Sequence, residues 1–203
     1  MTKINYQNMT DEIIEGIQES GERPRLLLHA CCAPCSSYCL EYLSGIFDIT
    51  VYYYNPNITA ESEYKHRCEE IKRFVENASF TRDVKLVFGD YEPERFLELA
   101  KGHENDPERG ARCHLCYRLR LENSAAYAKE NDFDYFTTTL SISPLKDAQV
   151  LNAIGKELSE KYDVAYLYSD FKKKNGYKRS IELSQEYSLY RQNFCGCEFS
   201  KHE

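Results

Sequence analysis

The stretch that decides the fold is "RLLLHACCAPCSS", residues 25–37, in which an apolar run leads directly into three cysteines. We interpret residues 25–30 as a strand buried on both faces, because a short apolar run followed by turn chemistry at Ala33–Pro34 is typical of one. A helix is predicted from Ser36 to Leu43, with Gly45 as its terminator. The cysteines therefore lie between a strand and the helix that follows it.

The same alternation continues along the chain. Further strands are predicted at 48–57, 84–91, 134–140 and 164–169, and further helices at 10–20 (capped by Thr10), 59–77, 93–101, 113–130, 147–161 and 181–190. This order predicts a single-domain, three-layer α/β fold with a mostly parallel sheet, Rossmann-like or HUP-like. We divide the chain into an N-terminal helical extension, 1–24, and one α/β catalytic domain, 25–203.

Ligands of such sheets bind at the carboxyl ends of the strands. Cys31, Cys32 and Cys35 lie just past the end of the first strand, so they are expected at this edge. The first of the expected functional groups is therefore a set of thiols.

The role expected for the nine cysteines depends on the compartment in which the protein works. No apolar stretch approaches the ~20 residues that span a bilayer, and the N-terminus lacks the apolar core of a signal peptide. We therefore expect a cytoplasmic protein without a membrane partner, in which cysteines serve metal binding or redox chemistry rather than structural disulfides. The net charge of −7 argues against a globally basic nucleic-acid binder.

A second thiol pair, Cys113 and Cys116, forms a CxxC motif at the start of a predicted helix. A pair placed there can direct both sulfurs to one point, and the helix dipole favours thiolates. Taken with Cys31 and Cys32, the motif indicates a site with four thiolates.

Four thiolates suit either tetrahedral zinc or an iron–sulfur cluster. Zinc sites usually draw on two spaced pairs, whereas adjacent cysteines can bind different irons of a cubane. We therefore favour a [4Fe–4S] cluster on Cys31, Cys32, Cys113 and Cys116. The alternative is that Cys31 and Cys32 are buried thiols and the CxxC is incidental.

Cys195-Gly196-Cys197 near the C-terminus is a third cysteine motif, and its spacing indicates a different role. A disulfide across one residue requires a sharp bend, which glycine permits, and the small ring would be strained and redox-active. The motif reads as a dithiol able to supply two electrons. The alternatives are two further metal ligands or a surface tail without a role.

The remaining cysteines, His29 and a basic segment give weaker indications of function. Cys35 faces the same edge and is a candidate for a second metal, while Cys39, Cys68 and His29 are expected in the core. The segment "KKKNGYKR", 172–179, holds five basic residues and no acid. It suits a phosphate backbone, with Tyr177 as a stacking face, or it is simply a solvated loop.

Five motifs together resemble the epoxyqueuosine reductase QueH family. They are "HACCAPC", "YYYNPNI", "RCHLCYRLRL", "TTTLSISPLKD" and "YRQNFCGCEFS", spread over residues 25–200. The order CC, CxxC, CGC is specific to this set.

The resemblance implies an oxidoreductase that converts epoxyqueuosine to queuosine at the wobble position of tRNA, without cobalamin. It assigns Cys31, Cys32, Cys113 and Cys116 as ligands of a [4Fe–4S] cluster, and Cys195 with Cys197 as the redox-active pair. It also implies a further iron beside the cluster in at least part of the family, whose members vary at the position of Cys35, and an electron donor that the sequence does not identify.

Two rival hypotheses follow from the residues alone. One is a structural zinc protein whose basic segment binds RNA without catalysis. The other is a sulfur-transfer enzyme on tRNA that uses the CGC pair as a persulfide carrier. The sequence lacks a nucleotide-binding loop, which counts against the second.

Overall fold

Five parallel strands form the centre of the computed structural model, which describes residues 4–200. The strands are β1 (Arg25–His29), β2 (Asp48–Tyr53), β3 (Lys85–Phe88), β4 (Tyr135–Thr138) and β5 (Ala165–Tyr166). Their order in the sheet is β3-β2-β1-β4-β5, and every pairing is parallel. This is the predicted α/β fold, with the Rossmann-like reversal of strand order at β1.

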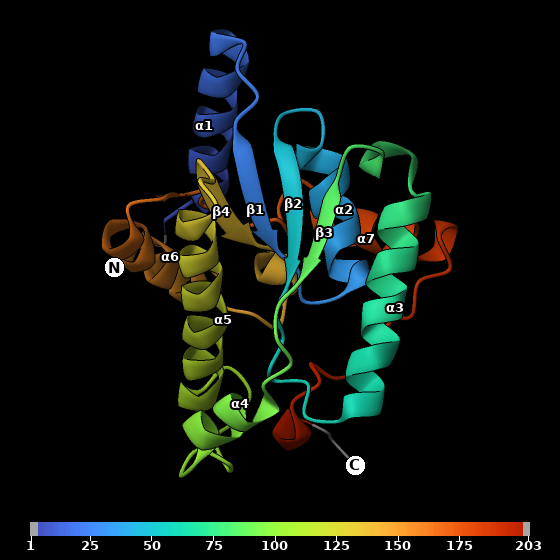
Figure 1. Cartoon of the computed structure of the whole chain (residues 1–203), viewed down its shortest axis with the longest axis vertical. Helices are drawn as coiled ribbons and strands as arrows, with labels where there is room; N and C mark the ends of the chain where they lie inside the picture. Colours follow the sequence, from blue (N-terminus) through green and yellow to red (C-terminus); the bar gives the residue numbers. More distant parts are fainter. Residues whose placement is uncertain (1–3, 201–203) are drawn as a thin grey trace.

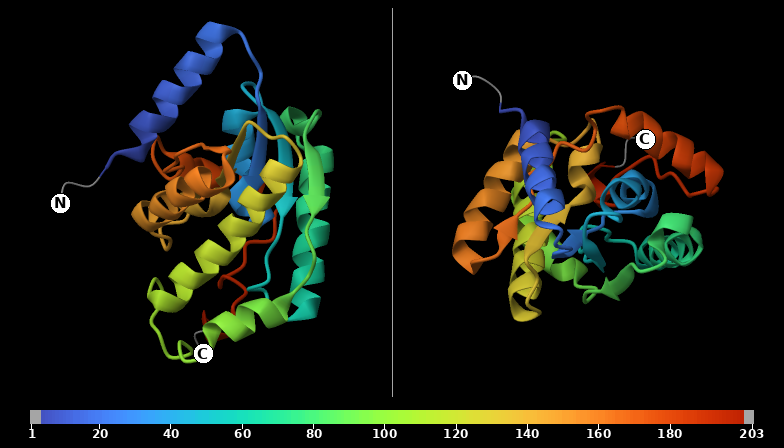
Figure 2. Two further views of the ribbon diagram at one scale, coloured as in Figure 1. Left: turned by 60° about the vertical axis from the view of Figure 1, so that its left-hand side comes forward. Right: turned by 90° about the horizontal axis from the view of Figure 1, so that it is seen from above.

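Helices cover both faces of the sheet (Figures 1 and 2). They are α1 (Tyr6–Ser20), α2 (Ala33–Leu43), α3 (Glu61–Asn77), α4 (Pro93–Ala100), α5 (Ala111–Glu130), α6 (Ala148–Tyr162) and α7 (Gly176–Glu186). Short 3₁₀ turns lie at Ser79–Thr81, Thr139–Ile142 and Glu198–Ser200. The alternation predicted from the sequence is confirmed.

Side chains of β1 alternate between two separate cores. Leu26 and Leu28 enter the core shared with α1, α2 and α3, whereas Leu27 enters the core shared with α4, α5 and α6. All three leucines are fully buried. Burial on both faces explains why this strand reads as a continuous apolar run.

Several elements differ from the predicted bounds, and three of the differences have a clear local cause. Helix α1 begins at Tyr6, so Thr10 lies inside it, and its hydroxyl donates to the Tyr6 and Tyr168 carbonyls instead of capping the helix. Strand β5 has two residues, because the chain leaves the sheet after Tyr166. Helix α7 begins at Gly176 instead of 181, where Asn175 in the left-handed conformation precedes it.

The ends of the strands and the end of the chain meet at one side of the molecule. In Figure 1 the arrowheads of β1, β2 and β3 point to the lower part of the view, where the red C-terminal segment lies. No helix within residues 4–200 has both the length and the apolar content needed to cross a bilayer.

Candidate active site

Three sulfur atoms gather where β1 gives way to α2. The Sγ atoms of Cys31, Cys32 and Cys35 all lie within 4.8 Å of one another, close enough to ligate one metal ion. Cys32 is the N-cap of α2, with extended backbone angles, and its Sγ accepts the backbone N–H of Cys35 at 3.3 Å. The helix thus starts at Ala33, three residues earlier than predicted, and this early start brings Cys35 beside the pair.

Strand β4 supplies a neighbour to this group. The hydroxyl of Thr139, just after β4, donates to Cys31 Sγ at 3.4 Å, and its oxygen accepts the Cys31 backbone N–H at 3.2 Å. Because β1 and β4 are parallel neighbours, the residues after both strands meet at this edge. The expectation that the thiols lie at the carboxyl ends of the strands is confirmed.

Cys113 and Cys116 lie in the first turns of α5, as predicted. The Sγ of Cys113 accepts the backbone N–H of Arg109 at 3.3 Å, and Cys116 is buried next to Arg120. Neither belongs to the tight group of three sulfurs, whose third member is Cys35. Arg120 interacts electrostatically with both Cys116 and Cys31, and so lies between the two sulfur groups.

The C-terminal tail returns to the same edge. The carbonyl of Cys195 accepts from Asn57 Nδ2 at 3.0 Å and from Arg67 Nη1 at 3.3 Å, and the Gly196 carbonyl accepts from the Thr59 N–H. Gly196 has a φ of +97°, and a Cβ there would lie 2.7 Å from Ile58 Cγ1. A glycine is therefore required between the two cysteines.

The two tail cysteines occupy different environments. Cys195 lines a cavity of about 540 Å³, and its Sγ lies 3.1 Å from the Ser200 hydroxyl. Cys197 is buried in the core that also contains Cys116. Only Cys195 can therefore meet a molecule that enters the cavity.

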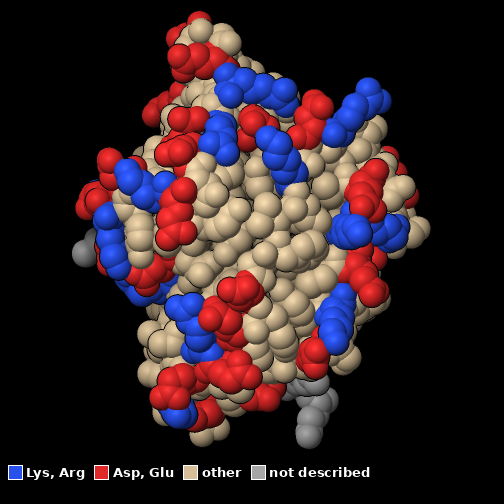
Figure 3. Space-filling model, in the orientation of Figure 1, with Lys and Arg blue, Asp and Glu red and all other residues tan. Residues whose placement is uncertain are grey.

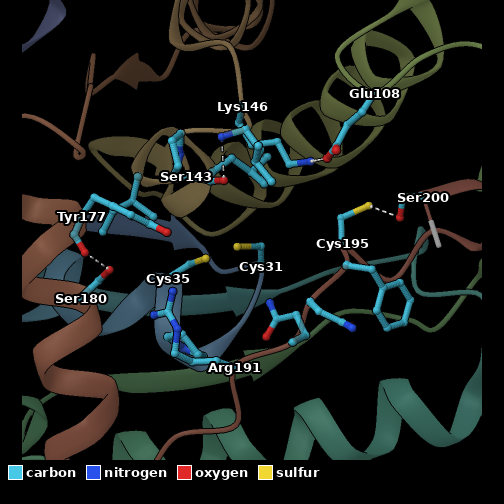
Figure 4. A pocket seen from close by; sticks show the side chains of 18 of the residues that line it. Cys31, Cys35, Glu108, Ser143, Lys146, Tyr177, Ser180, Arg191, Cys195 and Ser200 are labelled. Atoms are coloured by element: carbon cyan, nitrogen blue, oxygen red, sulfur yellow. Dashed lines mark hydrogen bonds and ion pairs between the residues drawn. The ribbon is translucent and has the colours of Figure 1, made fainter. Parts of the chain in front are cut away.

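Residues from both ends of the chain line this cavity, and Figure 4 shows their arrangement. Cys31 and Cys35 lie near its centre, Cys195 and Ser200 at one end and Tyr177 and Ser180 at the other. The remaining lining residues are Pro34, Arg67, Glu108, Arg120, Leu140, 142–146 and 191–194. Cys32, Cys113, Cys116 and Cys197 are not among the residues that line the cavity.

Four positive side chains that we did not select from the sequence line the cavity, namely Arg67, Arg120, Lys146 and Arg191, and Lys146 and Arg120 lie near its sulfur atoms. Lys146 is 8% exposed, and its Nζ is 3.2 Å from Glu108 Oε1. Arg120 is 3% exposed. Arg120 follows Cys113 and Cys116 at positions i+7 and i+4 of one helix, a spacing that places all three on one face and could have identified it.

Electrostatics divides the thiols into two kinds. Hydrogen bonds from the Cys32 and Cys35 thiols, with Arg120 and Thr139, hold the pKa of Cys31 well below its usual range. Burial and the bond to Cys31 raise the pKa of Cys32 to about 12. In the tail, the Cys197 thiol, Lys146 and Ser200 lower the pKa of Cys195. A negative charge is thus favoured on two of the three cysteines that line the cavity, Cys31 and Cys195, whereas the bonds to Cys31 and Cys32 raise the pKa of the third, Cys35.

The remaining expected residues follow the sequence analysis in part. Cys39 is fully buried, Cys68 packs against the first core, and His29 is a buried core histidine. In the basic segment, four of the five cationic side chains pair with acids, namely Asp170, Asp11, Glu182 and Glu41. The face seen in Figure 3 likewise intersperses both charge signs around an uncharged centre.

Comparison with known proteins agrees with this geometry. The family described as Epoxyqueuosine reductase QueH matches residues 26–203. A protein of that name from Staphylococcus epidermidis is 45% identical over 202 residues, covering 98% of this chain and 85% of its own length. Those from Streptococcus pyogenes serotype M1 and Thermotoga maritima are 42% and 35% identical, covering 98% and 86% of this chain and 78% and 89% of their own lengths. The protein described here belongs to the epoxyqueuosine reductase QueH family.

Proposed function

We propose that this protein reduces epoxyqueuosine in tRNA to queuosine, in the cytoplasm where tRNA is modified, with the Cys195–Cys197 dithiol, of which Cys195 lines the cavity, as the source of two electrons. The observation that carries the proposal is the convergence of Cys31 and Cys35, after the first strand, with Cys195, from the tail, on one cavity. Cys195 is more than 150 residues from Cys31 and Cys35 in the chain, and the fold nevertheless brings all three to the same cavity, as an active site built from distant motifs requires.

The donor set fits an iron–sulfur group. Three thiols lie within 4.8 Å of one another, and the buried Arg120 interacts electrostatically both with Cys31 of that group and with Cys116 of the CxxC. We propose that Cys31, Cys32, Cys113 and Cys116 would hold a [4Fe–4S] cluster, with Cys35 as a ligand of a further iron. Such a group supplies single-electron transfer, and an open iron supplies Lewis acidity towards an epoxide oxygen.

The tail dithiol matches the stoichiometry of the reaction. Conversion of an epoxide to an alkene breaks two carbon–oxygen bonds, forms a carbon–carbon double bond and releases the oxygen as water, which consumes two electrons and two protons. Closure of Cys195 and Cys197 into a disulfide releases two electrons and two protons. An external reductant, whose identity the sequence does not provide, must then reopen the disulfide.

The cavity wall offers groups that bind and orient a modified nucleoside. Lys146 and Ser200 present hydrogen-bond donors next to Cys195. Tyr177 lies at the other end, 37% exposed, where its ring can stack on a base. Tyr177 and Cys195 lie at opposite ends of the cavity, so the base can stack at the first while the epoxide-bearing substituent lies at the second.

The structural zinc alternative is less well supported. Structural zinc sites are closed and four-coordinate. Here Cys31, Cys35 and Cys195 line a cavity of about 540 Å³, and most of the basic segment is neutralised by acids within the chain. Metal analysis of protein purified without oxygen distinguishes the two: iron with sulfide supports the reductase, and zinc supports the binding module.

Replacement of Cys195 tests the dithiol. The variant Cys195→Ser should keep its iron and sulfide and lose multiple turnover when a small dithiol is the only reductant. Cys68→Ser, the same substitution outside the cavity, should turn over like the parent. Normal multiple turnover of Cys195→Ser would exclude the dithiol role.

A further inference from the structure

Arg120 is a buried cation without a carboxylate partner among residues 4–200. Its side chain is 3% exposed and lines the cavity. Its Nη2 donates to Asn55 Oδ1, and its Nη1 lies 4.0 Å from Cys116 Sγ. A charge taken out of water in this way is costly unless an opposite charge compensates it.

His29 does not supply that compensation. The Tyr54 carbonyl can only accept, so His29 Nε2 donates to it at 3.0 Å, and Nδ1 accepts from the Thr138 hydroxyl at 2.8 Å. Nε2 therefore has no lone pair for Arg120 Nε, which lies 3.4 Å away.

The other two deeply buried arginines are compensated differently. Arg67 pairs with Glu63 at 2.7 Å and donates to two tail carbonyls. Arg112 donates to the carbonyls of His103 and Glu104 at the end of a loop. Within residues 4–200, neither a carboxylate nor a backbone carbonyl accepts a hydrogen bond from Arg120, which sets it apart from both.

Sulfur atoms from three motifs lie near Arg120. Cys116, Cys31 and Cys195 all interact electrostatically with its guanidinium, and Cys116 Sγ lies 4.0 Å from Nη1. They come from α5, from the end of β1 and from the tail, so they belong to all three thiol motifs. One cation thus serves as the common neighbour of sulfurs from three parts of the chain.

We propose that Arg120 is a positioning residue, the fixed counter-charge of the sulfur site, and that its charge raises the reduction potential of the group bound there. This inference rests on the proposed function. A cluster held by four thiolates carries net negative charge that increases on reduction. A buried cation therefore stabilises the reduced state more than the oxidised one.

Three variants test the role of the charge. Arg120→Met removes the charge and keeps apolar bulk, Arg120→Lys keeps the charge, and Arg118→Gln removes a charge from the exposed side of the same helix, where Arg118 pairs with Glu157. The readouts are iron and sulfide content and the midpoint potential from an anaerobic redox titration followed by electron paramagnetic resonance.

Arg120→Met should shift the balance between oxidised and reduced cluster at least tenfold towards the oxidised form, a potential lower by about 59 mV for one electron. Arg120→Lys should shift it much less, and Arg118→Gln should leave it unchanged. Loss of the cluster from Arg120→Met but not from Arg120→Lys would also support the role of the charge.

Two results would overturn the inference. One is a potential in Arg120→Met equal to that of the parent. The other is an equal defect in Arg120→Met and Arg120→Lys, which would assign the effect to packing. A parent protein without iron and sulfide would instead contradict the proposed function itself, so the two failures are distinguishable.

Discussion

Cys32 serves the fold and the site with one sulfur atom. Its Sγ caps α2 by accepting the Cys35 N–H, and the same atom belongs to the group of three sulfurs. Serine at this position would keep a cap, because a hydroxyl accepts the same hydrogen bond, but would remove a sulfur that can ligate a metal. Stability and ligation can therefore be separated at this residue.

The buried His29 should make stability depend on pH. Its pKa is about 3 in the folded protein, against about 6.5 when exposed on unfolding. The unfolded chain binds a proton as the pH falls below 6.5 and the folded chain does not, so stability is lost between pH 6.5 and 3. The loss from pH 6.5 to 5 should be about 2 kcal/mol, by urea unfolding of the iron-free protein.

His29→Gln should flatten this pH dependence. The control is His66→Gln, which should leave it unchanged because His66 contacts Tyr190 and not the buried residues around His29. An unchanged slope in His29→Gln would show that other groups cause the effect.

Gly196 should resist replacement. An alanine would have to adopt a φ of +97°, with its Cβ 2.7 Å from Ile58 Cγ1. Gly196→Ala should lower the free energy of unfolding by about 1–3 kcal/mol. Gly45→Ala, where a Cβ meets nothing within 4 Å, should cost far less. Equal midpoints of denaturation for the two variants would contradict the account of the tail.

Among the elements, helix α3 holds the C-terminal tail in place. Arg67 projects from α3, is 2% exposed, and joins Glu63 to the carbonyls of Phe194 and Cys195. The Arg67 side chain therefore links the Glu63 carboxylate of α3 to the backbone next to the tail dithiol.

Arg67→Gln should release the tail and cost about 3 kcal/mol, because it leaves a partly buried Glu63 without its partner. Hydrogen exchange over residues 191–200 should quicken, while exchange in β1 should change little. Arg95→Gln, which breaks an exposed pair with Glu92, provides the control. Unchanged exchange of the tail in Arg67→Gln would show that other contacts hold it.

The elements also show what the sequence could predict. Strands β1, β2 and β4 were predictable because their apolar and aromatic runs reflect burial in a parallel sheet, a local signal. Strand β3 lies at the edge of the sheet and is only partly buried, and its short apolar run was still enough to predict it. The start of α7 was not, because it depends on a left-handed Asn175 and on pairing of the basic segment with Asp11 and Glu41. Those partners lie more than a hundred residues away in the chain.

The site, like the elements, could be predicted only in part. The strand-end rule placed Cys31, Cys32 and Cys35 at one edge from sequence alone. Arg120 and Lys146 were not selected, because their burial depends on how α5 and the segment after β4 pack together. Spacing identifies candidate ligands, but the charges that surround them are a property of the tertiary structure.

On the scale of the whole molecule, two cores on opposite faces of the sheet leave one edge for chemistry. The reversal of strand order at β1 opens that edge between β1 and β4, and the tail completes it from the far end of the chain. The fold thus brings the first and last thiol motifs to a single cavity.

The most direct test of this account is conversion of epoxyqueuosine in tRNA by protein purified without oxygen, with a chemical reductant, followed by mass analysis of the nucleosides. We expect queuosine, lacking one oxygen atom relative to the substrate, in a yield that depends on iron and sulfide in the preparation. Unchanged epoxyqueuosine after incubation with protein that carries both would contradict it.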